Sequence, residues 1–170
     1  MRKRRVIAAL ATVVAVGVAS IVMAVPANAS AGAYVEIVNA ITGKCADVAG
    51  ESLVPGAHVH QWDCENHANQ LWRPEDQGNG YIMYQNLLSG LCLTATPLPG
   101  GYTMSQNACV TSSLSLWRWE VADSAGHEVL ESGVANMCFA LDGVFSARNG
   151  WAIVLHDCAN TNGQYWRTDA

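Results

Sequence analysis

Short runs of alternating apolar and polar residues recur along the chain. Clear examples are "YVEIVNA" at residues 34–40, "AHVHQWDC" at 57–64 and "WAIVLHDC" at 151–158. Clusters of Gly, Pro, Asn and Ser separate such runs, as in "VPGA", "PLPGG" and "NTNG". A period of two residues is typical of a half-buried β-strand, and these clusters are typical of turns. The pattern therefore predicts an all-β domain of many short strands.

The runs belong to a unit that occurs three times, at about residues 34–75, 81–120 and 127–169. Each copy ends in a Trp-Arg pair, with a Cys eight residues before the Trp; these landmarks are Trp72, Trp117 and Trp166, and Cys64, Cys109 and Cys158. A period of about 45 residues also fits a propeller blade, but three blades are too few to close a propeller. A closed barrel with threefold symmetry removes the strand edges. We therefore expect one such domain over residues 34–170.

All six cysteines of the chain lie within the three copies. Six cysteines allow fifteen pairings. Each copy holds an earlier Cys 17 to 20 residues before the later one, so the repeat favours pairing within each copy: Cys45–Cys64, Cys92–Cys109 and Cys138–Cys158. Pairing between copies is the alternative. Each bridge within a copy would close a short loop and contribute about 3 kcal/mol by the chain-entropy account.

The N-terminal segment differs from the rest of the chain. It has a basic head, "MRKRR", then a long apolar run, then the small-residue sequence "ANA" ending at Ala29. These features predict a secretory signal peptide at residues 1–29, followed by a short leader at 30–33. The apolar run is also long enough to span a bilayer, so an uncleaved anchor is the alternative. Cleavage and an even number of cysteines predict a secreted, extracellular protein.

The charge of the remaining domain limits its partners. The signal carries four of the nine Lys and Arg, which leaves five bases against fourteen acids, a net charge near −9 (5 − 14), over 141 residues (170 − 29). That length suits one domain with a sizeable core. Nothing in so acidic a chain would displace counterions from nucleic acid or bind anionic lipid. We expect neither nucleic acid nor, after cleavage, a membrane as partner, and we expect a monomer.

The stretch "HVHQWDCENHANQLWRPE" invites a metal or enzyme interpretation. Zinc favours thiolate ligands, and Cys64 is expected to be oxidised. His58 and His60 share a face if this segment is a strand, so a two-His surface site is an alternative. Asp63 and Glu65 are too few carboxylates for calcium. No Gly-x-Ser-x-Gly sequence or free Cys nucleophile is present. We expect no metal, no cofactor and no catalytic activity.

The end of each copy carries a recognisable motif. Gln-x-Trp occurs as Gln70-Leu71-Trp72 and Gln164-Tyr165-Trp166, and in altered form as Ser115-Leu116-Trp117; the first copy also has Cys45-Ala46-Asp47. In these residues the chain resembles the ricin-type β-trefoil lectins, which also occur as carbohydrate-binding modules of glycoside hydrolases. The resemblance covers residues 34 to 169. It implies a β-trefoil of twelve strands, four per copy, with the three Trp residues in the shared core.

The resemblance implies a sugar site in the first copy, formed by Asp47, His60, Trp62, Asn69 and Gln70. Members of the family often carry Gln at the position of His60. The residue types suit a pyranose, because an aromatic ring takes its apolar face and a carboxylate and amides take its hydroxyls. Strand alternation places His60 and Trp62 on one face. Asp47 could instead bond only backbone amides, and Gln70 could be structural; His58 and His67 have no expected role.

The other two copies lack this set. The second has Thr94 for the Asp, Asn107 for the aromatic residue, and Leu114-Ser115 for Asn-Gln. The third has Ala140 for the Asp and Gly163 for the Asn, keeps His156 and Gln164, and has Asp142 two residues beyond Ala140. No site is expected in the second copy. The set is also broken in the third, where partial compensation by Asp142 is the alternative.

The resemblance thus implies a secreted, non-catalytic lectin that binds carbohydrate through one intact site, with galactose- or xylose-type glycans as ligands. The alternative is an interaction protein, such as a protease inhibitor, a toxin accessory or an envelope scaffold, with a vestigial sugar site.

Overall fold

The computed structural model describes residues 33–143 and 146–170, which form twelve strands and two short 3-10 turns. The expected signal peptide lies outside the described residues, as do residues 30–32 of the leader. The strands are β1 (Val35–Asn39), β2 (Cys45–Val48), β3 (Val59–Trp62), β4 (Leu71–Gly78), β5 (Tyr81–Asn86), β6 (Cys92–Leu98), β7 (Gly101–Asn107), β8 (Trp117–Val121), β9 (Glu128–Ser132), β10 (Met137–Leu141), β11 (Trp151–Asp157) and β12 (Trp166–Asp169). The turns are η1 (Ala49–Glu51) and η2 (Asn162–Gln164). The predicted all-β class is confirmed.

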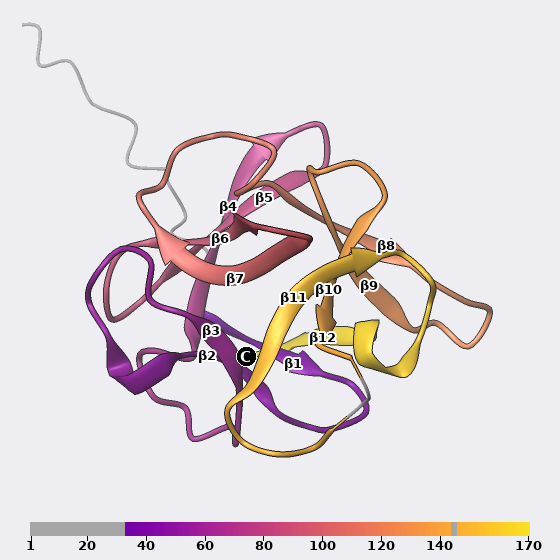
Figure 1. Cartoon of the computed structure of the whole chain (residues 1–170), viewed down its shortest axis with the longest axis horizontal. Coiled ribbons are helices and arrows are strands. Elements are labelled where there is room, and N and C mark those ends of the chain that lie inside the picture. The colour runs from indigo at the N-terminus through magenta and orange to yellow at the C-terminus, as the bar shows by residue number, and fades with distance from the viewer. Residues whose placement is uncertain (1–32, 144–145) are drawn as a thin grey trace, which may run out of the picture. The chain divides into compact units, whose positions relative to one another are not determined.

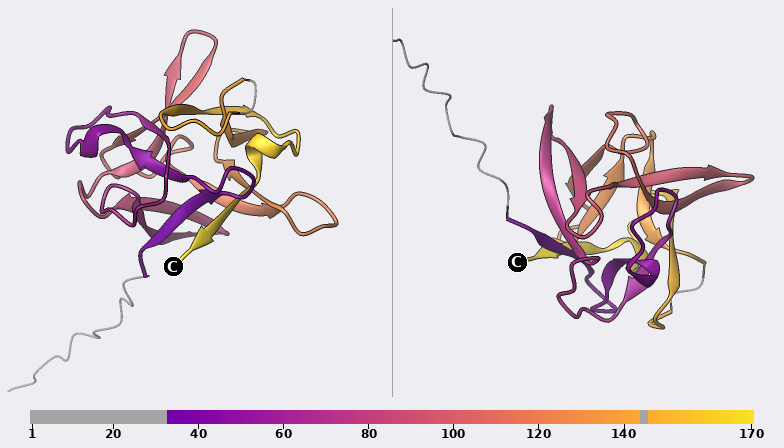
Figure 2. Two further views of the ribbon diagram at one scale, coloured as in Figure 1. Left: turned by 90° about the horizontal axis from the view of Figure 1, so that it is seen from below. Right: turned by 90° about the vertical axis from the view of Figure 1, so that its left-hand side faces the viewer.

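Half of the strands close into a barrel by antiparallel pairing, in the cyclic order β1, β4, β5, β8, β9, β12. The first and last strands of the chain, β1 and β12, lie side by side and close the ring (Figures 1 and 2). The other strands form three hairpins, β2–β3, β6–β7 and β10–β11. Strand β11 pairs with both β3 and β7, and an isolated bridge joins His58 to Ser105. This closed arrangement is the predicted β-trefoil.

The three copies follow one another around the fold, as the colours of Figure 1 show from indigo through salmon to yellow. Four strands come from each of the three copies recognised in the sequence. The copies share one core, which contains Trp72, Trp117 and Trp166, all at most 1% exposed. Each indole Nε1 donates a hydrogen bond to a backbone carbonyl 24 to 27 residues earlier. The core position expected for the three Trp residues is therefore confirmed.

The three disulfides pair within the copies, as the repeat predicted: Cys45–Cys64, Cys92–Cys109 and Cys138–Cys158. Each links the first residue of one hairpin strand, or a residue next to it, to the loop after the partner strand. The bridges therefore hold the open ends of the three hairpins together. Within residues 33–143 and 146–170, no helix has the length and apolar character that a membrane crossing requires.

Candidate functional site

The β2–β3 hairpin carries three of the five residues that the sequence singled out in the first copy, Asp47, His60 and Trp62, and the loop before β4 carries Asn69 and Gln70. Asp47 lies directly opposite His60, and Cys45 lies opposite Trp62. The alternation along β3 is as predicted, because Val59 is 1% exposed and Gln61 is fully buried, whereas the side chains of His60 and Trp62 are partly exposed. The Cys45–Cys64 disulfide clamps the hairpin at the end that carries Trp62.

Asp47 is the centre of a hydrogen-bond network, although it is only 6% exposed. Its Oδ1 lies 3.1 Å from His60 Nε2. Its Oδ2 accepts from Asn69 Nδ2 at 2.8 Å and from Gln70 Nε2 at 2.9 Å. Because a carboxylate can only accept, the hydrogen of the first contact sits on His60 Nε2. The donors offset the cost of burying the carboxylate and fix its orientation.

Trp62 forms one side of the site, and its ring stacks on that of His60 with centroids 5.5 Å apart and planes inclined by 21°. The third copy supports this strand. Gln61 Nε2 donates to the carbonyls of Ser146 and Arg148, at 2.6 and 2.9 Å, and a side chain at Gly150 would lie 3.8 Å from the Trp62 ring. The third copy thus holds the strand that carries the indole, and the absence of a side chain at Gly150 leaves space beside the ring.

Asp63, the residue after Trp62, is anchored outside the site. Its carboxylate accepts from Lys44 Nζ, and from Asn149 Nδ2 at 2.8 Å. The hydrogen bond from Lys44, followed by that from Asn149, lowers the pKa of the Asp63 carboxyl. Asp63 is therefore a structural anchor between copies rather than a ligand-binding group.

The network borders a pocket of about 270 Å³. Its lining includes four of the five residues that the sequence predicted: Asp47, His60, Trp62 and Asn69. Gly50, Glu51, Glu65 and His67 complete it. The imidazole of His67 lies between two carboxylates, with Nδ1 3.8 Å from Glu51 and 3.6 Å from Glu65. The sequence did not place these four residues in the site, because they lie in a short turn and a loop without periodicity. No role was expected for His67, which nevertheless lies in the pocket wall.

Gln70 does not line the pocket and is fully buried. Its Oε1 accepts from the Glu65 backbone N–H at 2.8 Å, and its Nε2 donates to the Asp63 carbonyl at 2.8 Å. Gln164 makes the same two contacts in the third copy, with the N–H of Ala159 and a backbone carbonyl. Gln70 therefore holds the loop and additionally orients Asp47, without a surface of its own in the pocket.

The second copy has no comparable arrangement at the matching positions. The Thr94 hydroxyl donates to the carbonyl of Cys92 at 2.9 Å, and Asn107 Nδ2 donates to the hydroxyl of Ser105 at 2.8 Å. These polar groups are engaged within the β6–β7 hairpin. No carboxylate or aromatic ring takes the places of those in the first copy.

The third copy has a larger hollow, of about 640 Å³, lined in part by Ala140, His156 and Gly163. Asp142 does approach His156, but their atoms are 3.9 Å apart and both side chains are more than half exposed. The buried, oriented acceptor of the first copy is therefore not reproduced, and His156 takes the place of the indole.

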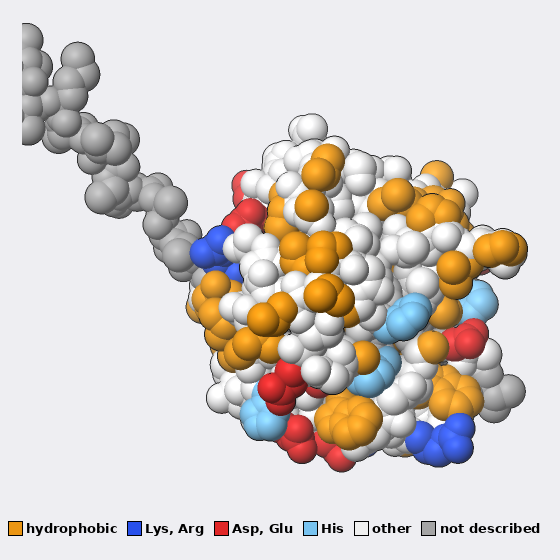
Figure 3. Space-filling view, turned by 60° about the vertical axis from the view of Figure 1, so that its left-hand side comes forward, with side chains coloured by type: hydrophobic (Ala, Val, Ile, Leu, Met, Phe, Trp, Pro, Cys, Tyr) orange, Lys and Arg blue, Asp and Glu red, His pale blue; other side chains and the backbone are white. Residues whose placement is uncertain are grey.

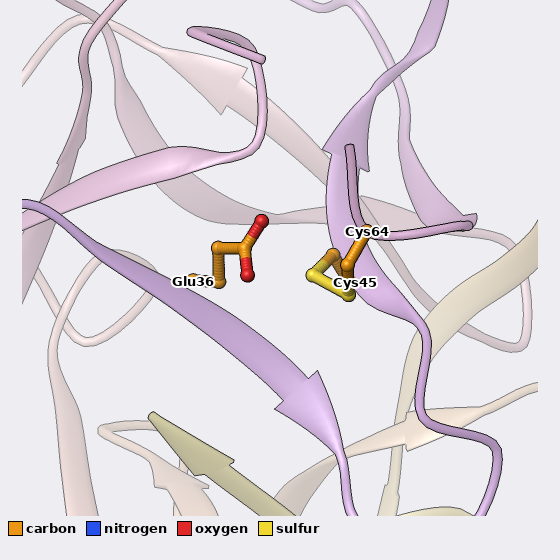
Figure 4. Close-up of side chains that lie close together, drawn as sticks. All are labelled: Glu36, Cys45 and Cys64. Carbon is orange, nitrogen blue, oxygen red and sulfur yellow. A yellow bond between two sulfur atoms is a disulfide. The ribbon is translucent and has the colours of Figure 1, made fainter. Parts of the chain in front are cut away.

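One group of potential metal ligands brings Glu36 beside Cys45 and Cys64 (Figure 4). Both sulfurs belong to the disulfide, so neither is a thiolate that could bind a metal ion. The backbone of His58 forms a β-bridge with Ser105, and its side chain is exposed, whereas the Nε2 of His60 is engaged by Asp47. These contacts give no support to the two-His alternative.

Known proteins share this fold. The designed threefold-symmetric protein ThreeFoil is 24% identical, with a TM-score of 0.74, and the match covers 81% of this chain and 98% of that one. An exo-β-1,3-galactanase from Clostridium thermocellum is 22% identical with a TM-score of 0.72; the match covers 80% of this chain but only 30% of the galactanase. The ricin B-like lectin of Macrolepiota procera, solved with lactose, is 20% identical with a TM-score of 0.69, covering 82% and 96%.

Among curated proteins, none matches this chain. The family described as "Ricin-type beta-trefoil lectin domain" matches residues 33–166, which is most of the chain. The match spans all three copies and the landmarks on which the resemblance rests. The chain belongs to the family of ricin-type β-trefoil lectin domains.

Proposed function

We propose that this protein is a secreted lectin that binds carbohydrate through one intact site, in the first copy, with galactose- or xylose-type glycans as ligands. The observation that carries the proposal is the pairing of Asp47 with Trp62. A buried carboxylate, fixed by three donors, lies beside a partly exposed indole in a pocket of about 270 Å³.

The proposed mode of binding follows from the chemistry of these groups. The indole of Trp62 takes a C–H face of the pyranose. Asp47 takes a sugar hydroxyl, with its carboxylate as acceptor, and Asn69 holds that carboxylate in the pocket wall. Gln70 acts indirectly, because its side chain holds Asp47 in position. The hydrogen bonds of the network exist before the ligand arrives, so binding does not have to order these side chains.

The comparisons support a carbohydrate ligand in general and galactose in particular. The Macrolepiota procera lectin was solved with lactose, whose terminal sugar is galactose, and the galactanase is named for a galactose polymer. Those ligands belong to those proteins. For this chain we expect one shallow site with a binding free energy of about −4 to −6 kcal/mol, which is a Kd on the order of 1 mM to 40 µM. We propose binding without catalysis.

The test is binding of the purified protein, without its first 29 residues, to a glycan array and to galactose and xylose by calorimetry. Trp62→Ala removes a partly exposed ring, so folding should survive; His156→Ala is the matched control at the same position of the third copy. We expect Trp62→Ala to lose at least tenfold in affinity and His156→Ala to retain it. If the wild-type protein binds no glycan, the interaction-protein alternative replaces the lectin proposal.

A further inference from the structure

The first-copy pocket is rich in negative charge and in hydrogen-bond acceptors. Three carboxylates line it, those of Asp47, Glu51 and Glu65, and no Lys or Arg is among its lining residues. Asp47 already accepts from three side chains. Glu51 and Glu65 are 65% and 49% exposed at the side chain, and within residues 33–143 and 146–170 neither carboxylate accepts a hydrogen bond. Both carboxylates lie within 4 Å of the imidazole of His67.

A buried amide adds an unused acceptor. Asn69 is 4% exposed, and its Nδ2 donates both to Asp47 and, at 3.1 Å, to the carbonyl of Val48. Those two acceptors fix which end of the amide is nitrogen. The Oδ1 atom is left buried without a partner among the described residues. An unpartnered buried acceptor is costly unless a donor reaches it.

The turn that carries Glu51 has an uncommon backbone. Glu51 has φ of 51° and follows Gly50 at 64°, so two successive residues are left-handed. Glycine adopts this conformation freely, whereas glutamate does so at a cost of roughly 1 kcal/mol or more. A charged residue therefore occupies a strained position on the pocket wall.

Charge elsewhere on the surface does not offset this group. On the face shown in Figure 3, one group of acidic side chains lies at the lower edge beside a histidine and away from the Lys and Arg side chains, whereas other acidic side chains lie next to Lys or Arg at the upper left. Lys44, the basic residue closest in sequence to the hairpin, is engaged by Asp63 and Asn149. A ligand in the pocket therefore meets three carboxylates and no Lys or Arg; the basic side chains among the lining residues are His60 and His67.

We propose that this pocket selects amino sugars with a free ammonium group, and that Glu51 and Glu65 are the residues that determine this specificity. The inference rests on the proposed function of the pocket as a sugar site. An ammonium group has three donors and no acceptor, which complements unused acceptors better than a hydroxyl does. Uronic acids carry the opposite charge and are disfavoured. Because both glutamates are about half exposed or more, each contributes modestly, and the expected preference is about three- to tenfold.

The experiment compares sugars that differ from one another at a single substituent. Calorimetry or NMR titration of the protein at about pH 7, where a sugar amine is protonated, gives the Kd of galactose, galactosamine and galacturonic acid, and of the glucose series. We expect the amino sugar to bind about three- to tenfold more tightly than the neutral sugar, and the uronic acid to bind most weakly. Raising the salt from about 0.1 M to about 1 M shortens the Debye length from about 10 Å to about 3 Å and should reduce the preference.

The variants Glu51→Gln, Glu65→Gln and their combination test the assigned residues. The readout is the ratio of the amino-sugar Kd to the neutral-sugar Kd within each protein, so a general change in affinity divides out. The ratio should approach one in the double variant and stay as in wild type in Asp142→Asn, an exposed carboxylate of the third copy. If neutral sugars bind but amino sugars bind no better, or the double variant keeps the preference, the specificity inference fails and the lectin proposal stands. If no sugar of either series binds, the proposed function itself fails.

Discussion

Gln70 and Gln164 allow the contribution of the Asp47 network to be measured separately from that of the loop. Both side chains are buried, and both accept from a loop N–H and donate to a loop carbonyl. Gln70 alone adds a bond to a carboxylate, from Nε2 to Asp47 Oδ2 at 2.9 Å. Gln164 Oε1 also accepts from the Thr161 N–H, but at 3.5 Å this contact is at the limit of hydrogen bonding. Truncation of each Gln to Ala should therefore differ mainly by the energy of the bond to Asp47.

The magnitudes follow from the bonds lost. Two neutral buried hydrogen bonds at about 1 to 1.5 kcal/mol each give about 3 kcal/mol for Gln164→Ala. A hydrogen bond to a charged group adds about 2 kcal/mol, so Gln70→Ala should cost about 5 kcal/mol. Urea-induced unfolding followed by Trp fluorescence measures both values.

A third variant isolates the carboxylate. In an Asp47→Ala background, Gln70→Ala should cost only the loop contribution, about 3 kcal/mol, so the coupling in the double-mutant cycle is about 2 kcal/mol. Equal costs for Gln70→Ala and Gln164→Ala in the wild-type background, within about 0.5 kcal/mol, would refute the account of Gln70 as the residue that orients Asp47.

Three further perturbations test the fold. Replacing both Cys92 and Cys109 by Ala should lower the free energy of unfolding by about 3 kcal/mol, because the bridge spans 17 residues. Sugar binding should persist, since this bridge lies in the second copy, and loss of binding by the folded variant would contradict the assignment of the site to the first copy. Burial raises the pKa of Tyr84 to about 12 from 10.0, so the contribution of the neutral phenol to the free energy of unfolding should be fully present below pH 10 and fall by up to about 3 kcal/mol toward pH 12. In chemical unfolding, Tyr84→Phe should lose less stability than the wild-type protein over this range, and an identical loss would count against this cause. The hydrogen bond from His127 lowers the pKa of Asp123 to about 2 from 3.8, so the stabilisation by the Asp123 carboxylate is present above pH 3.8 and is lost as the pH falls toward 2. The stability of Asp123→Asn should therefore fall less between about pH 4 and about pH 2 than that of the wild-type protein.

Much of the fold could be predicted because its determinants repeat. The spacing of Cys and Trp residues gave the three copies, the disulfide pairing within each copy and the core position of Trp72, Trp117 and Trp166. The shared face of His60 and Trp62 on β3 followed from the period of two residues, and the structure buries their neighbours Val59 and Gln61 on the opposite face. These features depend on local periodicity, which a single sequence displays directly.

The rest of the pocket could not be predicted, because its residues are brought in by loops. Glu51 enters the wall through a left-handed turn, and Glu65 and His67 enter through the loop between β3 and β4. Neither segment has a period that indicates which side chains face inward. The burial of Gln70 could not be predicted either, since its position in the Gln-x-Trp motif is compatible with both a structural and a ligand-binding role.

The most direct test of the central claim is an NMR titration of the ¹⁵N-labelled protein with galactose and xylose oligosaccharides. If the first copy holds the one sugar site, we expect saturable chemical-shift changes for the side-chain N–H signals of Trp62 and Asn69 and for the backbone of the β2–β3 hairpin, with one sugar bound per chain. Saturable shifts centred instead on the hollow around His156 in the third copy, or no saturable shifts with any glycan, would contradict this assignment.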